Sequence, residues 1–187
     1  MWLGLMESEI APYVRRFCRE LRVDAAREII VDVGANAGYY SLVFAKRCQS
    51  LVIAYEPDPA VRERLVGNLA RNPQLAPWID VRESAVAADG SGSVTLDGDL
   101  ATARVGLLKV DVDGSEVSVL AGARRLLTDS HPNVIVETHS VELEHSCAQL
   151  LIGAGYAPRV ITQRRLLPQN RPIEHNRWLV ASRCRLT

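Results

Sequence analysis

Short apolar runs alternate with longer amphipathic segments along most of the chain. The apolar runs, rich in β-branched residues, predict strands at residues 29–33, 51–55, 78–82, 106–111 and 133–137. Apolar positions at helical spacing predict helices at residues 9–21, 39–48, 60–71, 115–127 and 141–153. Strands that alternate with helices are typical of a mainly parallel sheet covered by helices on both faces.

The end of the chain departs from this alternation. Residues 156–162 and 178–182 predict two strands with no helix between them, which favours a closing antiparallel pair. Earlier, residues 89–93 predict a turn into a short strand at residues 94–96. No internal boundary indicates a second domain, so residues 1–187 are expected to form one domain with residues 1–25 as an N-terminal helical segment.

Composition narrows the class of protein. The chain is 48% hydrophobic, which is typical of a globular protein. Its 22 Lys and Arg residues equal its 22 Asp and Glu residues, so no basic field favours a nucleic acid partner. No apolar run approaches the roughly 18 residues that would span a membrane. A cytoplasmic protein without membrane partners is expected, and a monomer and a homodimer both stay open.

The cysteines indicate neither a disulfide framework nor a zinc site. The four residues are far apart in the sequence and include no C-x-x-C pair: Cys18, Cys48, Cys147 and Cys184. We therefore expect reduced thiols that pack as small hydrophobic side chains.

The most informative segment is residues 31–41, V-D-V-G-A-N-A-G-Y-Y-S, where a strand breaks into a glycine turn before a helix. A pyrophosphate there would meet the negative charge of Asp32. The ammonium and sulfonium of S-adenosylmethionine would be attracted instead, and its carboxylate could use free backbone N–H groups. The predicted cofactor contacts in this segment are Asp32, Gly34, Ala35, Asn36, Gly38 and Tyr39.

Two further strand ends extend the predicted cofactor site. Glu56, followed by Pro57, ends the second strand, where a doubly wound fold places an acid that accepts both ribose hydroxyl protons. Ser84 and Ala85 follow the third strand, where a hydroxyl could bond the adenine.

The fourth main strand ends in residues 109–116, K-V-D-V-D-G-S-E. Strand alternation places Lys109, Asp111 and Asp113 on one side. Asp111 is the predicted residue that faces the transferred methyl. The predicted catalytic residues are Asp111, His139 and Lys109, and pairing with a neighbouring acid is the alternative role for Lys109. Asp113, three residues before Glu116, predicts an N-cap in a capping box, with substrate contact as the alternative.

The fifth strand ends in residues 136–140, V-E-T-H-S, beside Asp111 in the expected strand order. His139 could remove a proton from a hydroxyl at neutral pH. We expect no metal ligand here, although Asp111, Glu137 and His139 could alternatively hold Mg²⁺ or Mn²⁺.

Four segments taken together resemble the FkbM family of S-adenosylmethionine-dependent methyltransferases. They are residues 31–41, 55–57 (Y-E-P), 109–116 and 119–123 (V-L-A-G-A). The resemblance implies a Rossmann-like class I methyltransferase fold with a seven-stranded sheet in the order 3-2-1-4-5-7-6, the last strand antiparallel. It also implies O-methylation of hydroxyls on sugars and related metabolites, and a cofactor contact from Glu7, which follows Met6 where the family often has tyrosine.

The sequence thus predicts an S-adenosylmethionine-dependent methyltransferase that acts on a hydroxyl of a small molecule or saccharide. Residues in and just after the loop at residues 163–176 could line its substrate mouth, namely Arg164, Arg165, Arg171, His175 and Arg177. An RNA or protein methyltransferase with the same cofactor site is the second interpretation. A nicotinamide-dependent oxidoreductase and a cofactor-binding module without catalysis are the others.

Overall fold

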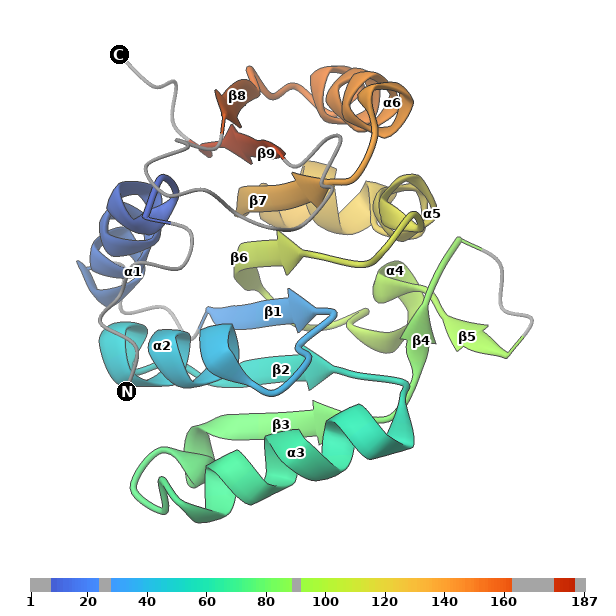
Figure 1. Ribbon diagram of the computed structural model, residues 1–187. Helices are drawn as coiled ribbons and strands as arrows, with labels where there is room; N and C mark the ends of the chain where they lie inside the picture. The colour runs from blue at the N-terminus through green and yellow to red at the C-terminus, as the bar shows by residue number, and fades with distance from the viewer. Residues whose placement is uncertain (1–7, 24–27, 89–91, 163–176, 184–187) are drawn as a thin grey trace, which may run out of the picture.

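A seven-stranded sheet forms the centre of the computed structural model, which describes residues 8–23, 28–88, 92–162 and 177–183 (Figure 1). The strand order is β3-β2-β1-β6-β7-β9-β8, which confirms the predicted order. Along the chain the strands of this sheet are β1 (Ile29–Val33), β2 (Val52–Tyr55), β3 (Ile79–Arg82), β6 (Val105–Val110), β7 (Asn133–Thr138), β8 (Arg159–Thr162) and β9 (Arg177–Ala181).

The pairing of the strands is parallel through the centre and antiparallel at one edge. β1 pairs in parallel with both β2 and β6, and β7 continues the parallel part beyond β6. β9 runs antiparallel to β7 and to β8, as the missing helix between the last two strands predicts. The chain therefore reverses its direction of winding between β1 and β6, and a sheet of this kind binds ligands at such a point.

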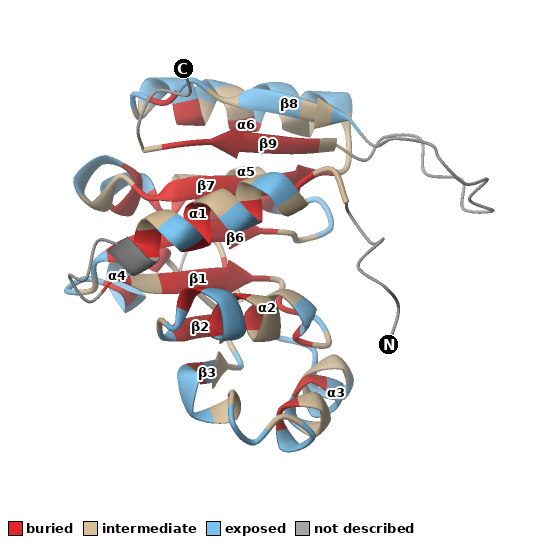
Figure 2. Ribbon diagram, turned by 90° about the vertical axis from the view of Figure 1, so that its left-hand side faces the viewer, coloured by how far each residue is buried: buried red, intermediate tan, exposed pale blue. Residues whose placement is uncertain are grey.

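Helices cover both faces of the sheet. On one face of the sheet lie α1 (Ala11–Val23), α2 (Tyr39–Cys48) and α3 (Pro59–Ala70) (Figure 2). Buried apolar residues of these three helices belong to a common core. On the other face lies a second core, which is contributed by α4 (Leu96–Asp99), α5 (Glu116–Ala121), η2 (Leu126–Ser130) and α6 (Val141–Gly153). Because both faces are covered, every residue of β6 and β7 is buried.

The predicted helix at residues 115–127 is in fact two pieces. α5 ends at Ala121, and a separate π-helical turn, η2, follows it. A side chain at Gly122 would place its Cβ 2.6 Å from the carbonyl oxygen of Ala87, so the chain passes closely here. Asp97 then accepts hydrogen bonds from the amides of Arg125 and Leu126, both at 2.8 Å, and starts the second piece.

The region before β6 also differs from the prediction. The short strand expected at residues 94–96 is β5 (Ser93–Val94), and it pairs with β4 (Ala85–Val86), which the pattern did not predict. Leu96 belongs to α4 because the hydroxyl of Thr95 accepts the amide of Gly98 and caps a helical turn. A short 3-10 turn, η1 (Ala76–Trp78), likewise takes Trp78 out of the expected third strand.

The expectation of reduced thiols is wrong for two of the four cysteines. Cys18 of α1 and Cys48 of α2 form a disulfide, with their Cα atoms 4.6 Å apart. The two helices pack side by side on one face of the sheet, which brings together residues separated by 30 positions. Cys147 is a buried free thiol, and Cys184 lies outside the described residues.

Among the helices of the described ranges, none is long and apolar enough to cross a membrane.

Candidate functional site

The candidate site begins where the glycine turn after β1 meets the chain after β6. Gly34 has a φ of +74°, and a Cβ there would lie 1.8 Å from the carbonyl oxygen of Asp111. The amide of Asp111 also donates to the carbonyl oxygen of Val33 at 3.0 Å. Only glycine fits this close approach, so the turn and the backbone of Asp111 are in direct contact at the edge of the sheet.

The amide groups of the turn, residues 34–38, are bonded within the protein. Two of them donate to the carbonyl oxygen of Tyr55, at 3.1 and 3.0 Å, and two have partners inside the turn. The fifth donates to a carboxylate oxygen of Glu56 at 2.9 Å. The expected free N–H groups are therefore absent from this described segment, and a ligand would have to compete for these hydrogen bonds.

Glu56 lies at the carboxyl end of β2 and is only 7% exposed. One oxygen of its carboxylate accepts the amide of Asn36, and the other accepts the amide of Asp58 at 3.0 Å. These bonds hold the carboxylate against the turn after β1. Each oxygen has a second lone pair, so the side chain can still accept from a ligand hydroxyl.

Asp32, the acid before the turn, is fully buried. Its Oδ2 accepts a hydrogen bond from the Ser41 hydroxyl at 2.6 Å, and its Oδ1 lies 3.4 Å from Nζ of Lys109. Lys109 is also 3.2 Å from Asp111 Oδ2 and 4.9 Å from the ring centre of Tyr40. The predicted pairing of Lys109 with an acid is thus confirmed, and the charge of Asp32 is directed at this lysine.

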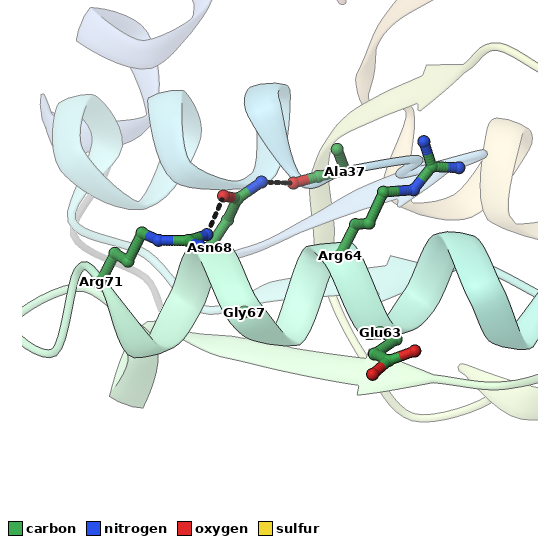
Figure 3. Close-up of a pocket in the computed structure, with 6 residues that line it drawn as sticks. All are labelled: Ala37, Glu63, Arg64, Gly67, Asn68 and Arg71. Carbon is green, nitrogen blue, oxygen red and sulfur yellow. Dashed lines mark hydrogen bonds between the residues drawn. The ribbon is translucent and has the colours of Figure 1, made fainter.

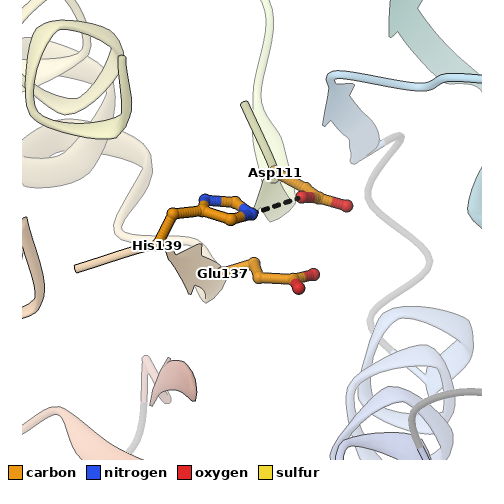
Figure 4. A group of neighbouring side chains, drawn as sticks. All are labelled: Asp111, Glu137 and His139. Carbon is orange, nitrogen blue, oxygen red and sulfur yellow. Dashed lines mark ion pairs between the residues drawn. The ribbon is translucent and has the colours of Figure 1, made fainter. Parts of the chain in front are cut away.

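The ends of β6 and β7 bring Asp111, Glu137 and His139 together (Figure 4). His139 Nε2 lies 3.9 Å from Asp111 Oδ1 and 3.3 Å from Asp113 Oδ1. Its Nδ1 lies 2.5 Å from Oε1 of Glu116, which is fully buried at the start of α5. The imidazole ring therefore has one nitrogen held by a buried carboxylate and the other directed at the surface acids.

These acids change the proton affinity of His139. The hydrogen bond to Glu116 raises the pKa of the imidazole to about 9, against the opposing effect of burial, and the charges of Glu116, Glu137 and Asp111 add to the increase. With no ligand bound, the ring holds its proton at neutral pH. His139 can act as a base only if that proton is displaced first.

The structure contradicts the capping-box prediction for Asp113. The side chain of Asp113 is 99% exposed and faces His139, and no side chain caps α5. The carboxylate of Glu116 instead turns to His139 and to the amide of Gly114, at 3.4 Å. The turn at Gly114, with a φ of +92°, separates Asp113 from the helix start.

The other predicted cofactor residues lie along the same edge. Tyr39 begins α2 and is half exposed, Pro57 follows Glu56 at the surface, and Ser84 and Ala85 lie just beyond β3. Glu7 lies outside the described residues, as do Arg164, Arg165, Arg171 and His175. The structure therefore places no residue of the predicted substrate mouth, apart from Arg177, which lies 3.5 Å from Glu144.

A shallow pocket of about 410 Å³ lies beside this edge, between the glycine turn and α3 (Figure 3). Asn68 donates to the carbonyl oxygen of Ala37 at 2.9 Å and so fixes the outer side of the turn. The pocket is separate from the strand-end carboxylates, because it is lined by Ala37, Glu63, Arg64, Gly67, Asn68 and Arg71.

Four contributors to the site were not predicted. Ser41 bonds Asp32, Asn68 bonds the turn, Glu116 holds His139, and Trp178 Nε1 donates to Glu137 Oε2 at 3.2 Å. Glu116 stands in the 109–116 motif, so a signal for it existed but was assigned to a helix cap. Ser41 also stands in a motif, at the end of residues 31–41, but no role was predicted for it, whereas Asn68 and Trp178 come from elements whose packing the pattern does not specify.

The strand order is that of a Rossmann-like methyltransferase fold. Methyltransferase FkbM from Methylobacillus flagellatus KT has this fold, with a TM-score of 0.70 and 19% identity over 82% of this chain and 43% of that chain. Magnesium protoporphyrin IX methyltransferase from Synechocystis PCC 6803 with bound SAM has a TM-score of 0.58 and 14% identity, over 97% of this chain and 85% of that one.

Sequence comparison finds similarity to one methyltransferase family. The family model described as the Methyltransferase FkbM domain matches residues 91–161, which include Asp111 and His139. Hexuronic acid methyltransferase AglP of Haloferax volcanii is 28% identical over 138 residues, which are 60% of this chain and 56% of AglP. The chain spans just over half the length of this curated relative. The resemblance to FkbM methyltransferases that the motifs predict is thereby confirmed.

Proposed function

We propose that the chain is an S-adenosylmethionine-dependent methyltransferase that acts on a hydroxyl of a saccharide or another small molecule. The packing of Gly34 on the backbone of Asp111 supports the proposal most directly, because it places the predicted cofactor turn beside the residue of the predicted reaction site. The match to the FkbM domain and the name of AglP, which acts on a hexuronic acid, support the reaction and the class of acceptor.

The residues at this edge fit the cofactor chemically. Glu56 offers acceptor oxygens to ribose hydroxyls. The partly exposed carboxylate of Asp111 at the end of β6 favours a cationic ligand over a pyrophosphate, whereas the charge of Asp32 is taken up by Lys109. When bound, S-adenosylmethionine supplies a methyl group that its sulfonium already activates. The protein then has to align the acceptor and exclude water.

Asp111 is the proposed catalytic carboxylate. Its side chain is 29% exposed, so it can reach an acceptor, and Lys109 holds its Oδ2. We assign it the tasks of orienting the acceptor hydroxyl and receiving the hydroxyl proton. Lys109 is a positioning residue, and His139, as an imidazolium, would orient an acceptor oxygen by donating a hydrogen bond.

The test separates the cofactor from the acceptor. Calorimetric titration should show binding of S-adenosylhomocysteine and not of NAD, and Glu56→Gln should weaken binding about tenfold or more, the effect of losing about 1.4 kcal/mol. Glu63→Gln, at an exposed position of α3, is the matched control. Binding of NAD alone would overturn the proposal.

Acceptors are then screened by mass spectrometry for a gain of one methyl group. Hexuronic acids, neutral sugars, RNA and protein extracts form the panel. Methylation of a saccharide supports the proposal, whereas methylation confined to RNA or protein would replace it with the second interpretation.

A further inference from the structure

We propose that Asp111, Glu137 and His139 bind a divalent cation, Mg²⁺ or Mn²⁺, at the ends of β6 and β7. One carboxylate oxygen from each acid and one ring nitrogen of His139 lie within 4.8 Å of one another. A six-coordinate cation at about 2.1 Å from its ligands spaces those ligands by about 3.0 to 4.2 Å. The observed 3.9 Å between Asp111 Oδ1 and His139 Nε2 is wider than the roughly 3.0 Å between adjacent ligands, so a bound cation would draw these groups closer together.

The fold presents these three groups from two adjacent parallel strands. Asp111 directly follows β6, Glu137 is the second-last residue of β7, and His139 directly follows β7. In Figure 4 the side chains of Asp111 and Glu137 extend to the same side of the strand ends, with the His139 ring beside Asp111. Side chains on rigid strand ends hold a ligand set more accurately than side chains on loops.

A second observation concerns Glu116, which is not one of the three ligands. It is fully buried and holds His139 Nδ1 at 2.5 Å, while Nε2 is left to face Asp111. Histidines that bind metals are commonly oriented in this way, by a carboxylate that accepts the other ring N–H and fixes the tautomer. Without a cation, a fully buried carboxylate in this position would serve only to hold a half-buried surface ring.

The third ligand is oriented independently. Oε2 of Glu137 accepts a hydrogen bond from Nε1 of the buried Trp178 at 3.2 Å, and Glu137 itself is 6% exposed. Each of the buried partners, Glu116 and Trp178, therefore fixes one ligand. Asp111 is fixed by Lys109 through Oδ2, which leaves Oδ1 on the His139 side.

The local charge also favours a cation. The carboxylates around the ring of His139 belong to Asp111, Asp113, Glu116 and Glu137. Glu116 Oε2 is buried and has no hydrogen-bond partner among the described residues. Carboxylate oxygens with one imidazole suit Mg²⁺ or Mn²⁺, whereas no thiolate stands here to favour zinc or copper.

The chemical role of the cation rests on the proposed function, because the cation would take part in the same methyl transfer. It would draw electron density from the acceptor hydroxyl, lower the pKa of that hydroxyl and replace Asp111 as the group that activates it. The oxygen forms a bond to the methyl carbon, the bond from that carbon to sulfur breaks, the neutral thioether leaves and the hydroxyl proton passes to bulk water. Asp111 then serves as a ligand and an orienting group, and His139 gives up its Nε2 proton to the cation and no longer orients the acceptor as an imidazolium.

The experiment measures Mn²⁺ binding by calorimetry and by the loss of the free-ion electron paramagnetic resonance signal, with no acceptor present. We expect one site per chain that Mg²⁺ competes for. His139→Gln and Glu137→Gln should weaken binding about tenfold or more, and Glu116→Gln about 10- to 100-fold, without touching the ion. Glu63→Gln, an exposed acid on α3, should bind Mn²⁺ like the wild type.

Thermal unfolding with and without Mn²⁺ checks that each variant is folded and gives a second measure of binding. Mn²⁺ should raise the melting temperature of the wild type and of Glu63→Gln, and leave that of His139→Gln unchanged. No binding to the wild type up to about 1 mM Mn²⁺ would overturn the inference. So would equal binding by His139→Gln.

Titration of S-adenosylhomocysteine in EDTA separates this inference from the proposed function. Cofactor binding without Mn²⁺ binding would leave the proposed function standing and remove the cation. Mn²⁺ binding without cofactor binding would leave the cation site and remove the methyltransferase.

Discussion

The Lys109 ammonium nitrogen lies 3.4 Å from Oδ1 of Asp32, and both side chains are buried in the centre of the sheet. The register of β1 against β6 places the two residues opposite each other. The same ammonium group lies 3.2 Å from Asp111 Oδ2 at the edge of the candidate site. Lys109 thus connects a buried acid of the core with the proposed catalytic carboxylate.

Replacement of the lysine should destabilise the protein strongly. Lys109→Met leaves Asp32 buried without its counter-charge, so we expect a loss of about 3 to 5 kcal/mol in the free energy of unfolding. Urea unfolding at pH 7 measures it. Adding Asp32→Asn to Lys109→Met should restore part of the loss, whereas Lys46→Met, at an exposed position, should change little. Equal stability of the two lysine variants would contradict the role given to Lys109.

Gly34→Ala should disrupt the junction between β1 and β6. The added Cβ meets the Asp111 carbonyl oxygen at 1.8 Å and the φ of +74° disfavours any side chain, so the loss should reach about 3 kcal/mol or more. Gly92→Ala is the matched control, because Gly92 has a φ of +79° with nothing within 4 Å of the added Cβ. Urea unfolding should show that Gly92→Ala loses about 1 to 2 kcal/mol. Equal losses would mean that the contact with Asp111 is unimportant.

The sequence predicted the centre of the sheet well because the central strands are buried on both faces. Such strands read as continuous β-branched runs, and the runs at β1 and β7 could be located almost to the residue. The predicted limits of α2 and α6 also agree with the structure, because the sequence marks where these helices begin. Glycine precedes α2, and the Ser140 hydroxyl accepts the amide of Leu143 and caps α6.

Pair partners inside the site were harder to predict. Alternation placed Lys109 and Asp111 on one side, but it could not show that the lysine also reaches Asp32 on the next strand. Asp113 and Glu116 have the spacing of a capping box, yet Glu116 turns to His139, which lies 23 positions away in the sequence. A local pattern cannot decide between a helix cap and a partner supplied by another strand.

The disulfide between Cys18 and Cys48 should contribute measurably to stability. Closing a loop of 30 residues should stabilise the protein by about 3 to 4 kcal/mol, so dithiothreitol should lower the free energy of unfolding by that amount. Iodoacetamide, followed by mass spectrometry, counts thiols in the unfolded chain. We expect two modified cysteines before reduction and four after it. Four before reduction would show that the pair is reduced.

The remaining described cysteine should be inert in the folded protein. Burial raises the pKa of the Cys147 thiol to about 12, with a smaller effect from the charge of Glu116. At pH 8 almost no thiolate is present, so alkylation should proceed only on unfolding. The rate is measured in a Cys184→Ser background to remove the cysteine outside the described residues. Rapid alkylation under native conditions would contradict the packing of α6.

The helix start beside Glu56 should make stability depend on pH. Asp58 Oδ1 accepts the amides of Ala60 and Val61, at 2.8 and 3.0 Å, and these bonds lower the pKa of its carboxyl below 3.8. A lowered pKa in the folded state means that the ionised carboxylate stabilises the fold above pH 3.8, and that this contribution is lost as the pH falls through the folded pKa. Asp58→Ala should therefore lower the melting temperature at pH 7, and the difference from the wild type should narrow in acid. Glu63→Ala, on the same helix, provides the comparison. A difference that stays constant down to pH 2 would mean that Asp58 acts through something other than its charge.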